Sequence, residues 1–93
     1  MDLKNLKFTG HAVRQMFSRG ISNAEVRAVI EKGEAISEYS DDKPFPSKLL
    51  LGFSNGRPLH VVFAYDSEEN TGYVITAYVP DKEIWSTDFK RRK

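Results

Sequence analysis

The chain contains no cysteine, and this absence removes two classes of site. Without cysteine there are no disulfide bonds and no thiolate metal site. The two histidines, His11 and His60, are far apart in the sequence and form no metal-ligand pair of the H-x-x-x-H type. We therefore expect a protein that binds neither a metal ion nor another cofactor.

Long apolar runs are also missing. No stretch approaches the roughly 18 consecutive apolar residues that a membrane-spanning helix requires. The opening segment Met1–Lys7 is too short and too charged to resemble a secretory signal. With the lack of cysteine, these features predict a reduced, cytoplasmic protein that does not enter a membrane.

Apolar and aromatic residues are present in the proportions of a folded domain. The 93 residues are 40% hydrophobic and 12% aromatic, which indicates a packed core rather than a disordered chain. A core of this size is small, so each large apolar residue matters for stability. We expect a single domain over residues 1–93 that ends in a short basic tail, residues 90–93.

Positive charge is concentrated at the end of the chain. The net charge is only +1, yet Lys90–Lys93 are consecutive basic residues, and the remaining basic residues are outnumbered by 13 acidic ones. The chain is therefore not a globally basic nucleic-acid binder. Contact with RNA would come from a local patch, either the tail or the region of Lys43, Lys48 and Arg57. A terminal basic cluster is alternatively a solvated tail.

Residues 11–19 predict an amphipathic helix with two distinct sides. The apolar side, expected to pack on a sheet, consists of Ala12, Val13, Met16 and Phe17. The polar side consists of His11, Gln15, Ser18 and Arg19. An imidazole and a permanent cation on one face could flank a phosphodiester. The simpler interpretation is that they are the solvated residues of the helix.

A second helix is predicted to begin directly after Ile21. Ser22 is the expected N-cap, and Glu25 is placed to complete a capping box. Gly20 and Gly33 are each expected to end a helix in the left-handed conformation.

From residue 34 onward the apolar period changes to two, which predicts four strands. These are residues 35–39, 48–54, 57–65 and 73–79, with a proline-containing loop at 41–47. The order of elements predicts an α+β fold with an antiparallel meander. Beyond the last strand, Trp85 and Phe89 are expected to dock the C-terminal segment, with one helical turn near Trp85 and a mobile tail beyond.

Asn55-Gly56 is the strongest hairpin signal in the chain, and it fixes a register. If Ser54 faces Arg57, Leu51 lies opposite His60. His60 then shares one sheet face with Thr76 and Tyr78, opposite the continuously apolar face that should receive the helices. A histidine at such a position is either a catalytic group or, more commonly, a hydrogen-bonded structural residue.

Spaced motifs run along most of the chain, from about Phe8 to Arg92. They are His11-x4-Met16-x2-Arg19-Gly20-Ile21-Ser22, then Gly33, Tyr39, Gly52, Gly56-Arg57-Pro58-Leu59-His60-Val61-Val62, Thr76-Ala77-Tyr78-x-Pro80-Asp81, Trp85 and Arg91-Arg92. This pattern resembles a bacterial family of domains of unknown function that is similar to the BrnT and RelE/ParE-type toxins of toxin–antitoxin modules.

The resemblance implies a RelE-like α+β fold, with two N-terminal helices packed on a curved, mainly antiparallel four-stranded sheet. It also implies a toxin that acts on RNA, in some cases on the ribosome, and that is neutralised by a cognate antitoxin protein. RelE-type proteins are metal-independent endoribonucleases, whereas ParE-like relatives share the fold without cleaving RNA. The fold alone therefore does not decide activity.

Metal-free RNA cleavage uses the ribose 2′-OH as nucleophile and requires a base, an acid and a cation near the phosphate. His11 and His60 are the candidate base and acid, and Arg19 is the candidate phosphate ligand. Tyr39, Tyr78 and Trp85 are candidates for stacking on an unpaired base. Gln15, Thr76 and Arg92 complete the expected substrate-binding set.

Two hypotheses follow from different classes of protein. One is an RNA-cleaving toxin, and the other is a non-catalytic module that binds protein or nucleic acid through the same polar residues. They differ in whether His11, Arg19 and His60 meet in one cleft, because a catalyst needs its acid and base close to one phosphate.

Overall fold

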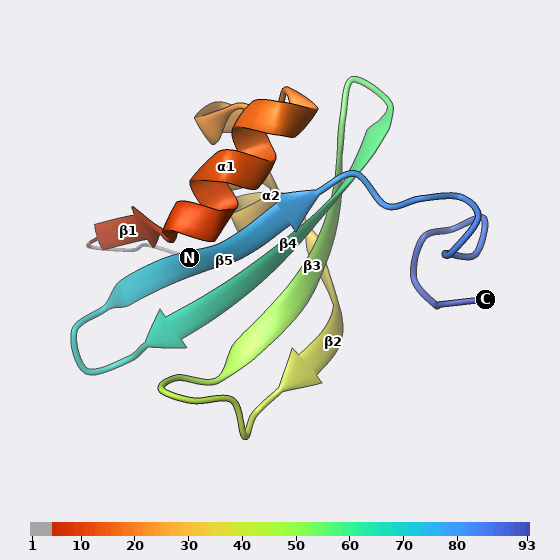
Figure 1. Cartoon of the computed structure of the whole chain (residues 1–93). Coiled ribbons are helices and arrows are strands. Elements are labelled where there is room, and N and C mark those ends of the chain that lie inside the picture. The colour runs from red at the N-terminus through yellow and green to blue at the C-terminus, as the bar shows by residue number, and fades with distance from the viewer. Residues whose placement is uncertain (1–4) are drawn as a thin grey trace.

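A computed structural model of the chain describes residues 5–93. It is an α+β structure with two helices and a single sheet of five strands in the order β1-β5-β4-β3-β2. The elements are β1 (Asn5–Phe8), α1 (Gly10–Arg19), α2 (Asn23–Lys32), β2 (Glu34–Tyr39), β3 (Ser47–Ser54), β4 (Arg57–Asp66) and β5 (Thr71–Tyr78). Figure 1 shows α1 lying along β5 and the hairpin of β3 and β4 at the centre of a twisted sheet.

The sheet is mixed, because β1 precedes the helices and pairs in parallel with β5. Asn5 lies opposite Thr71 and Phe8 opposite Val74 in this pairing. The expected four-stranded, mainly antiparallel sheet of RelE-like type, preceded only by helices, is therefore wrong. A strand of four residues has too short a pattern to be recognised, and its partner lies at the far end of the chain.

The four strands that the period-two pattern predicts are all present, with ends that differ by at most two residues. The β3–β4 hairpin has the predicted register, with Ser54 opposite Arg57 and Leu51 opposite His60. Asn55 and Gly56 have φ values of 52° and 81°, as a two-residue turn of this kind requires. The turn therefore fixes which face of β4 carries His60.

The helix ends follow the predicted chemistry with one exception. The Ser22 side chain accepts from the Glu25 N–H, and the Glu25 carboxylate accepts from the Ser22 N–H, which completes the capping box. Gly20 ends α1 in the left-handed conformation. Gly33, expected to do the same for α2, has a φ of −73° and leads straight into β2. Glycine is needed there for space, because a Cβ would lie 2.4 Å from the Val29 carbonyl oxygen.

The core lies between the helices and one face of the sheet. The β4 residues on this face are Leu59, Val61 and Phe63, as predicted, and all are buried. They belong to one apolar cluster with Ala12 and Met16 of α1 and with residues of α2 and β5. Among residues 5–93, neither helix is long and apolar enough to cross a bilayer.

The apolar side of α1 does not pack as predicted. Ala12 and Met16 are buried, but Val13 is 53% exposed and Phe17 is 90% exposed. Because α1 packs mainly on the single strand β5, only one narrow ridge of the helix faces the core. Val13 and Phe17 lie about 100° further around the helix and point toward solvent.

A bulge in β5 changes the alternation near the middle of the sheet. Val62 pairs with Thr76 and Phe63 with Val74, so that Ile75 has no partner on β4. Ile75, expected on the core face, is 38% exposed instead. Thr76 and Tyr78 still fall on the predicted face, opposite Val62 and His60.

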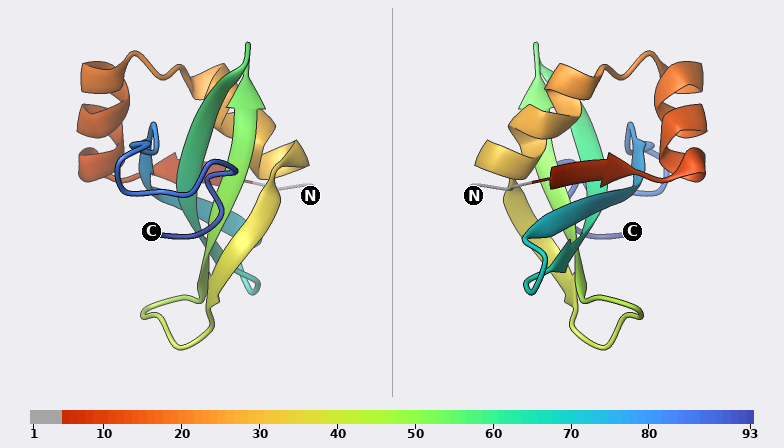
Figure 2. Two further views of the ribbon diagram at one scale, coloured as in Figure 1. Left: turned by 90° about the vertical axis from the view of Figure 1, so that its right-hand side faces the viewer. Right: turned by 90° about the vertical axis from the view of Figure 1, so that its left-hand side faces the viewer.

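The C-terminal segment, residues 80–93, crosses the sheet face that the helices leave uncovered. In one view of Figure 2, α2 lies in front of the strands with α1 to one side, and in the other view the C-terminal segment lies in front of them. The Asp81 carbonyl accepts from the N–H groups of Ile84 and Trp85, which forms the predicted single turn. Trp85 is buried and forms an isolated bridge with Arg92.

Residues 90–93 are not a free tail. The Lys90 ammonium lies 3.1 Å from the Glu34 carboxylate, and the Lys93 N–H donates to the Ile84 carbonyl over 2.8 Å. The expectation of a mobile tail is therefore wrong. A run of consecutive basic residues gives no indication of these long-range contacts.

Candidate functional site

The predicted site residues fall into two groups that the structure does not bring together. His11, Gln15 and Arg19 lie on α1. The sheet face opposite the helices, here called the open face, carries the second group, which consists of Tyr39, His60, Thr76, Tyr78, Trp85 and Arg92. Among residues 5–93, no hydrogen bond or ring contact joins His11 to His60. His60 points away from the sheet face on which α1 packs, so the described residues show no contact that brings His11, Arg19 and His60 into one cleft.

His60 is completely buried beneath the C-terminal segment. Its Nε2 lies 2.8 Å from the Phe89 carbonyl oxygen, and its Nδ1 lies 3.2 Å from the Tyr78 hydroxyl. The Trp85 ring meets the imidazole edge-on at a centroid distance of 4.4 Å. Burial lowers the pKa of His60, partly offset by the hydrogen bond to Phe89. His60 is thus a neutral imidazole whose two nitrogens are both hydrogen-bonded. It corresponds to the hydrogen-bonded structural residue that the sequence left open as the alternative to a catalytic group.

Tyr78 links the buried imidazole to the surface of the open face. Its ring is half-buried, and burial raises the pKa of its hydroxyl. The Arg92 guanidinium opposes this shift in pKa, and the Tyr39 hydroxyl adds to it. Arg92 also lies 5.4 Å above the Trp85 ring, in a cation–π contact. Aromatic rings and one cation therefore gather at this point of the face.

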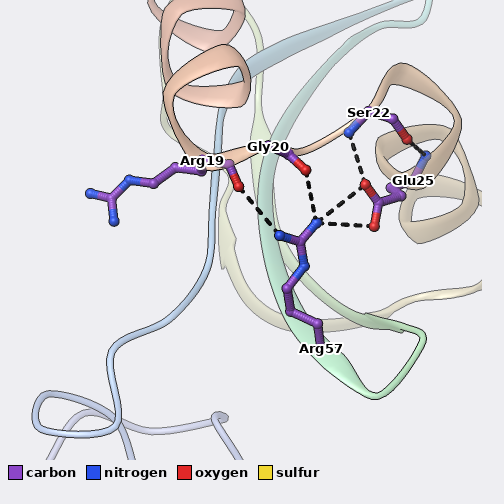
Figure 3. Close-up of polar contacts among 5 residues, drawn as sticks. All are labelled: Arg19, Gly20, Ser22, Glu25 and Arg57. Carbon is purple, nitrogen blue, oxygen red and sulfur yellow. Dashed lines mark hydrogen bonds and ion pairs between the residues drawn. The ribbon is translucent and has the colours of Figure 1, made fainter.

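The α1 group is exposed. Figure 3 shows that the Arg19 side chain extends away from the network around Arg57, and only the Arg19 carbonyl takes part, accepting from Arg57 over 3.3 Å. Within the described residues the Arg19 guanidinium forms no ion pair. Arg19 is thus free to bind a ligand, but on a helix face rather than in a cleft.

Arg57 serves the fold rather than a ligand. Its Nη2 donates to the Gly20 carbonyl over 3.1 Å and contacts both oxygens of Glu25, at 3.2 Å and 3.1 Å (Figure 3). These bonds tie the β3–β4 hairpin to the connection between the helices. Of the other basic candidates, Lys48 is paired with Glu38 at 3.9 Å, whereas Lys43 has no ion pair within residues 5–93.

Glu25 is held in its charged form by the same network. The Ser22 N–H contributes most, the Ser54 hydroxyl next, and Arg57 also contributes, so the pKa of Glu25 falls from 4.5 to about 2. A carboxylate that accepts several hydrogen bonds cannot act as a general acid near neutral pH. We assign Glu25 to stability.

A cavity at the other end of the open face escaped the sequence analysis. The loop before β3 forms one wall with Asp42 and Phe45, and Tyr73 of β5 forms another. The two rings stack with a centroid distance of 5.5 Å and an interplanar angle of 9°. The signal in the sequence was Phe45 between two prolines, an apolar ring held in a loop, but its partner ring lies on a distant strand.

Among residues 5–93, no three histidine, aspartate or glutamate side chains lie close enough together to hold a metal ion. No curated protein and no solved structure matches the chain at a significant level. A family described as a domain of unknown function, DUF4258, matches residues 8–79. This span covers both helices and strands β2 to β5, well over half of the chain. The chain therefore belongs to the DUF4258 family of domains of unknown function.

Proposed function

We propose that this domain is a cytoplasmic, non-catalytic module that binds single-stranded RNA across the open face. The observation that carries the proposal is the chain of contacts that runs from Arg92 over the Trp85 ring and through His60 to the Tyr78 hydroxyl. Tyr39 of β2 lies on the same face, in the row of Ser47 and Ala64. Unpaired bases stack on aromatic side chains, and arginine binds phosphate through its planar guanidinium. The face combines both kinds of group.

Exposure supports this use of the face. Tyr39 is 41% exposed, Arg92 is exposed, and Tyr78 and Thr76 are partly exposed. Thr76, which lies opposite Val62, adds a hydroxyl that can form hydrogen bonds. Trp85, also expected to stack on a base, is buried against His60, because it belongs to the C-terminal segment that covers this end of the face.

The burial and hydrogen bonding of His60 favour binding over cleavage. His60 has no exposed surface, and its ring nitrogens are occupied by Tyr78 and Phe89. General acid–base catalysis requires a titrating group within hydrogen-bond reach of the substrate. His60 does not meet that requirement without movement of the C-terminal segment.

The test is fluorescence anisotropy with a short labelled RNA of adenosine and uridine. Arg92→Ala should weaken binding and reduce the slope of log K against log salt by about 0.7, the value for one phosphate contact with a single strand. Tyr39→Ala should weaken binding with little change in that slope, because it removes stacking. Arg27→Ala is the matched control, since Arg27 is an exposed arginine on α2. Failure of the unmodified protein to bind, or equal losses for Arg92→Ala and Arg27→Ala, would overturn the proposal.

The RNA-cleaving toxin is a second candidate, supported by the resemblance to BrnT and RelE/ParE-type proteins. The structural observation that favours it is the Tyr78 hydroxyl, which is hydrogen-bonded to the His60 imidazole. In this reading the ribose 2′-OH loses its proton and attacks the phosphate. The bond from phosphorus to the 5′-oxygen breaks, and that oxygen takes a proton, so that one product ends in a 2′,3′-cyclic phosphate and the other begins with a 5′-hydroxyl. The test is incubation of end-labelled RNA in EDTA, with and without ribosomes, for the protein and for Tyr78→Phe. Intact RNA in both conditions would remove this candidate.

A toxin also requires a cognate antitoxin, and we place that partner on the outer side of α1. Val13 and Phe17 form an exposed apolar pair there, and α1 carries His11, Arg14 and Arg19 but no acidic residue. The matching partner is an acidic amphipathic segment. If the adjacent gene encodes such a protein, Phe17→Ser should weaken the purified complex more than Ile84→Ser, a change of another exposed residue. Equal affinities would exclude α1 as the interface.

A further inference from the structure

We infer that the cavity lined by Asp42, Phe45 and Tyr73 binds one unpaired guanine base. This inference rests on the proposed RNA binding and adds a base preference to it. The cavity has a volume of about 400 Å³ and opens on the same face as the Tyr39–Tyr78–Arg92 group. That volume is within the range of small-ligand sites.

The inner surface of the cavity is apolar and flat. Val62 and Ala64 of β4 line it, and they alternate with core residues so that their side chains point to the open face. The stacked rings of Phe45 and Tyr73 stand beside them as a preformed aromatic wall. A planar ring that inserts here gains apolar and aromatic contact without the need to order a mobile side chain.

A single carboxylate gives the cavity its chemical preference. Asp42 lines the cavity, and its Oδ2 accepts a hydrogen bond from the hydroxyl of Ser47. Ser47 is only 3% exposed, so its hydroxyl fixes the carboxylate from a rigid position on β3. Each carboxylate oxygen has two lone pairs, and therefore both oxygens of Asp42 remain able to accept from a ligand.

A carboxylate accepts hydrogen bonds and cannot donate them, so it selects a base edge that offers two neighbouring donors. Guanine presents N1–H and N2–H side by side on its Watson–Crick edge. Adenine, cytosine and uracil each present an acceptor next to their donor on this edge. That acceptor would lie against the second carboxylate oxygen, and the two acceptors would repel each other. Asp42 therefore matches guanine among the four bases.

Charge and spacing connect this cavity to the rest of the open face. Lys43 lines the cavity beside Asp42 and has no ion pair within residues 5–93, so its ammonium is available for the phosphate of the same nucleotide. Ala64 lies four residues from His60 along β4, or roughly 13 Å at 3.3 Å per residue. A strand of RNA along β4 would thus contact the cavity and the Tyr78 region through different nucleotides.

The experiment compares short single-stranded RNAs that differ by one central base. The protein should bind an oligonucleotide with a central guanosine about tenfold more tightly than one with a central adenosine or uridine, the discrimination of one bidentate pair. Asp42→Asn should abolish that preference, so that the oligonucleotides with and without guanosine bind with equal affinity. Asp41→Asn is the matched control, because Asp41 is an exposed neighbour outside the lining of the cavity. Thermal unfolding of each variant verifies that the loop change has not unfolded the protein.

The outcomes separate the two proposals. Tight binding of every oligonucleotide without preference for guanosine contradicts the guanine site and leaves RNA binding standing. Binding of guanosine monophosphate alone, lost in Asp42→Asn, supports the guanine site with a free nucleotide as its ligand. If that occurs while no RNA binds, the RNA-binding function is wrong and the site is right. No binding of either kind of ligand overturns both.

Discussion

Nε2 of His60 donates a hydrogen bond to the Phe89 carbonyl oxygen over 2.8 Å, across 29 positions of the chain. A carbonyl only accepts, so the neutral imidazole carries its proton on Nε2, and Nδ1 accepts from the Tyr78 hydroxyl. Phe89 has a φ of 62°, which turns the C-terminal segment toward the sheet at that point. The histidine therefore fastens the C-terminal segment to β4 and β5.

This arrangement predicts a loss of stability in mildly acidic solution. Burial lowers the pKa of folded His60 below its ordinary value of 6.5. As the pH falls below about 6.5, the unfolded chain binds a proton that the folded chain does not, and the free energy of unfolding decreases. Chemical denaturation between about pH 7 and pH 5 should show this decrease. His60→Gln should remove it, whereas His11→Gln should retain it, and an unchanged slope in His60→Gln would disprove the assignment.

Glu25 predicts a second loss at lower pH. Its pKa falls from 4.5 to about 2, chiefly through the Ser22 N–H and then the Ser54 hydroxyl. The charged form therefore stabilises the fold above about pH 4.5, and this contribution is lost as the pH falls toward 2. Thermal unfolding as a function of pH should show a shallower acid transition in Glu25→Gln. Glu31→Gln, an exposed change on the same helix, serves as control and should keep the steeper transition.

The cap of α2 and the hairpin turn should differ in their cost to stability. Ser22→Ala removes the side-chain acceptor for the Glu25 N–H and should destabilise the fold by about 1 kcal/mol. Gly56→Val should cost at least about 1–2 kcal/mol, because Gly56 has a φ of 81° and valine is β-branched. No atom lies within 4 Å of a Cβ at Gly56, so this cost comes from the backbone alone. Urea denaturation measures both, and Asn55→Gly at the neighbouring left-handed position should be nearly neutral.

Deletion of residues 90–93 should loosen the C-terminal segment without unfolding the domain. It removes the ion pair of Lys90 with Glu34, the Lys93 N–H bond and the Arg92 cation over Trp85. The ion pair is largely exposed and contributes little by itself. Trp85 is the single tryptophan of the chain, so its fluorescence should shift to longer wavelength as its cover is lost. Lys90→Gln controls for the ion pair alone, and unchanged emission after the deletion would show that Trp85 is held by other contacts.

Local chemistry made several parts of the fold predictable. Ser22 and Glu25 form a capping box within one helical turn, and Asn55-Gly56 sets the register of its hairpin through two residues. From that register the face of His60 followed, and the structure confirms it. Each of these inferences depends on residues that are neighbours in the sequence.

Features that depend on distant partners were not predictable in this way. The pairing of β1 with β5, the exposure of Phe17 and the stack of Phe45 on Tyr73 are all decided by tertiary packing. The candidate site divided for the same reason. His11 and His60 have side chains suited to acid–base chemistry, but their separation depends on how α1 packs against the sheet, which the sequence alone does not reveal.

The pairing of β1 with β5 has a consequence for the order in which the chain becomes structured during synthesis. Asn5–Phe8 leaves the ribosome early, yet its partner Thr71 is made 66 residues after Asn5. His60 likewise lacks its carbonyl acceptor until Phe89 has been added. A nascent chain that ends before Thr71 exposes β1 without its partner, and one that ends before Phe89 leaves His60 without its acceptor. An unpaired strand can pair with another chain. Completion of this sheet thus waits for the synthesis of β5, and the hydrogen bond of His60 waits for Phe89.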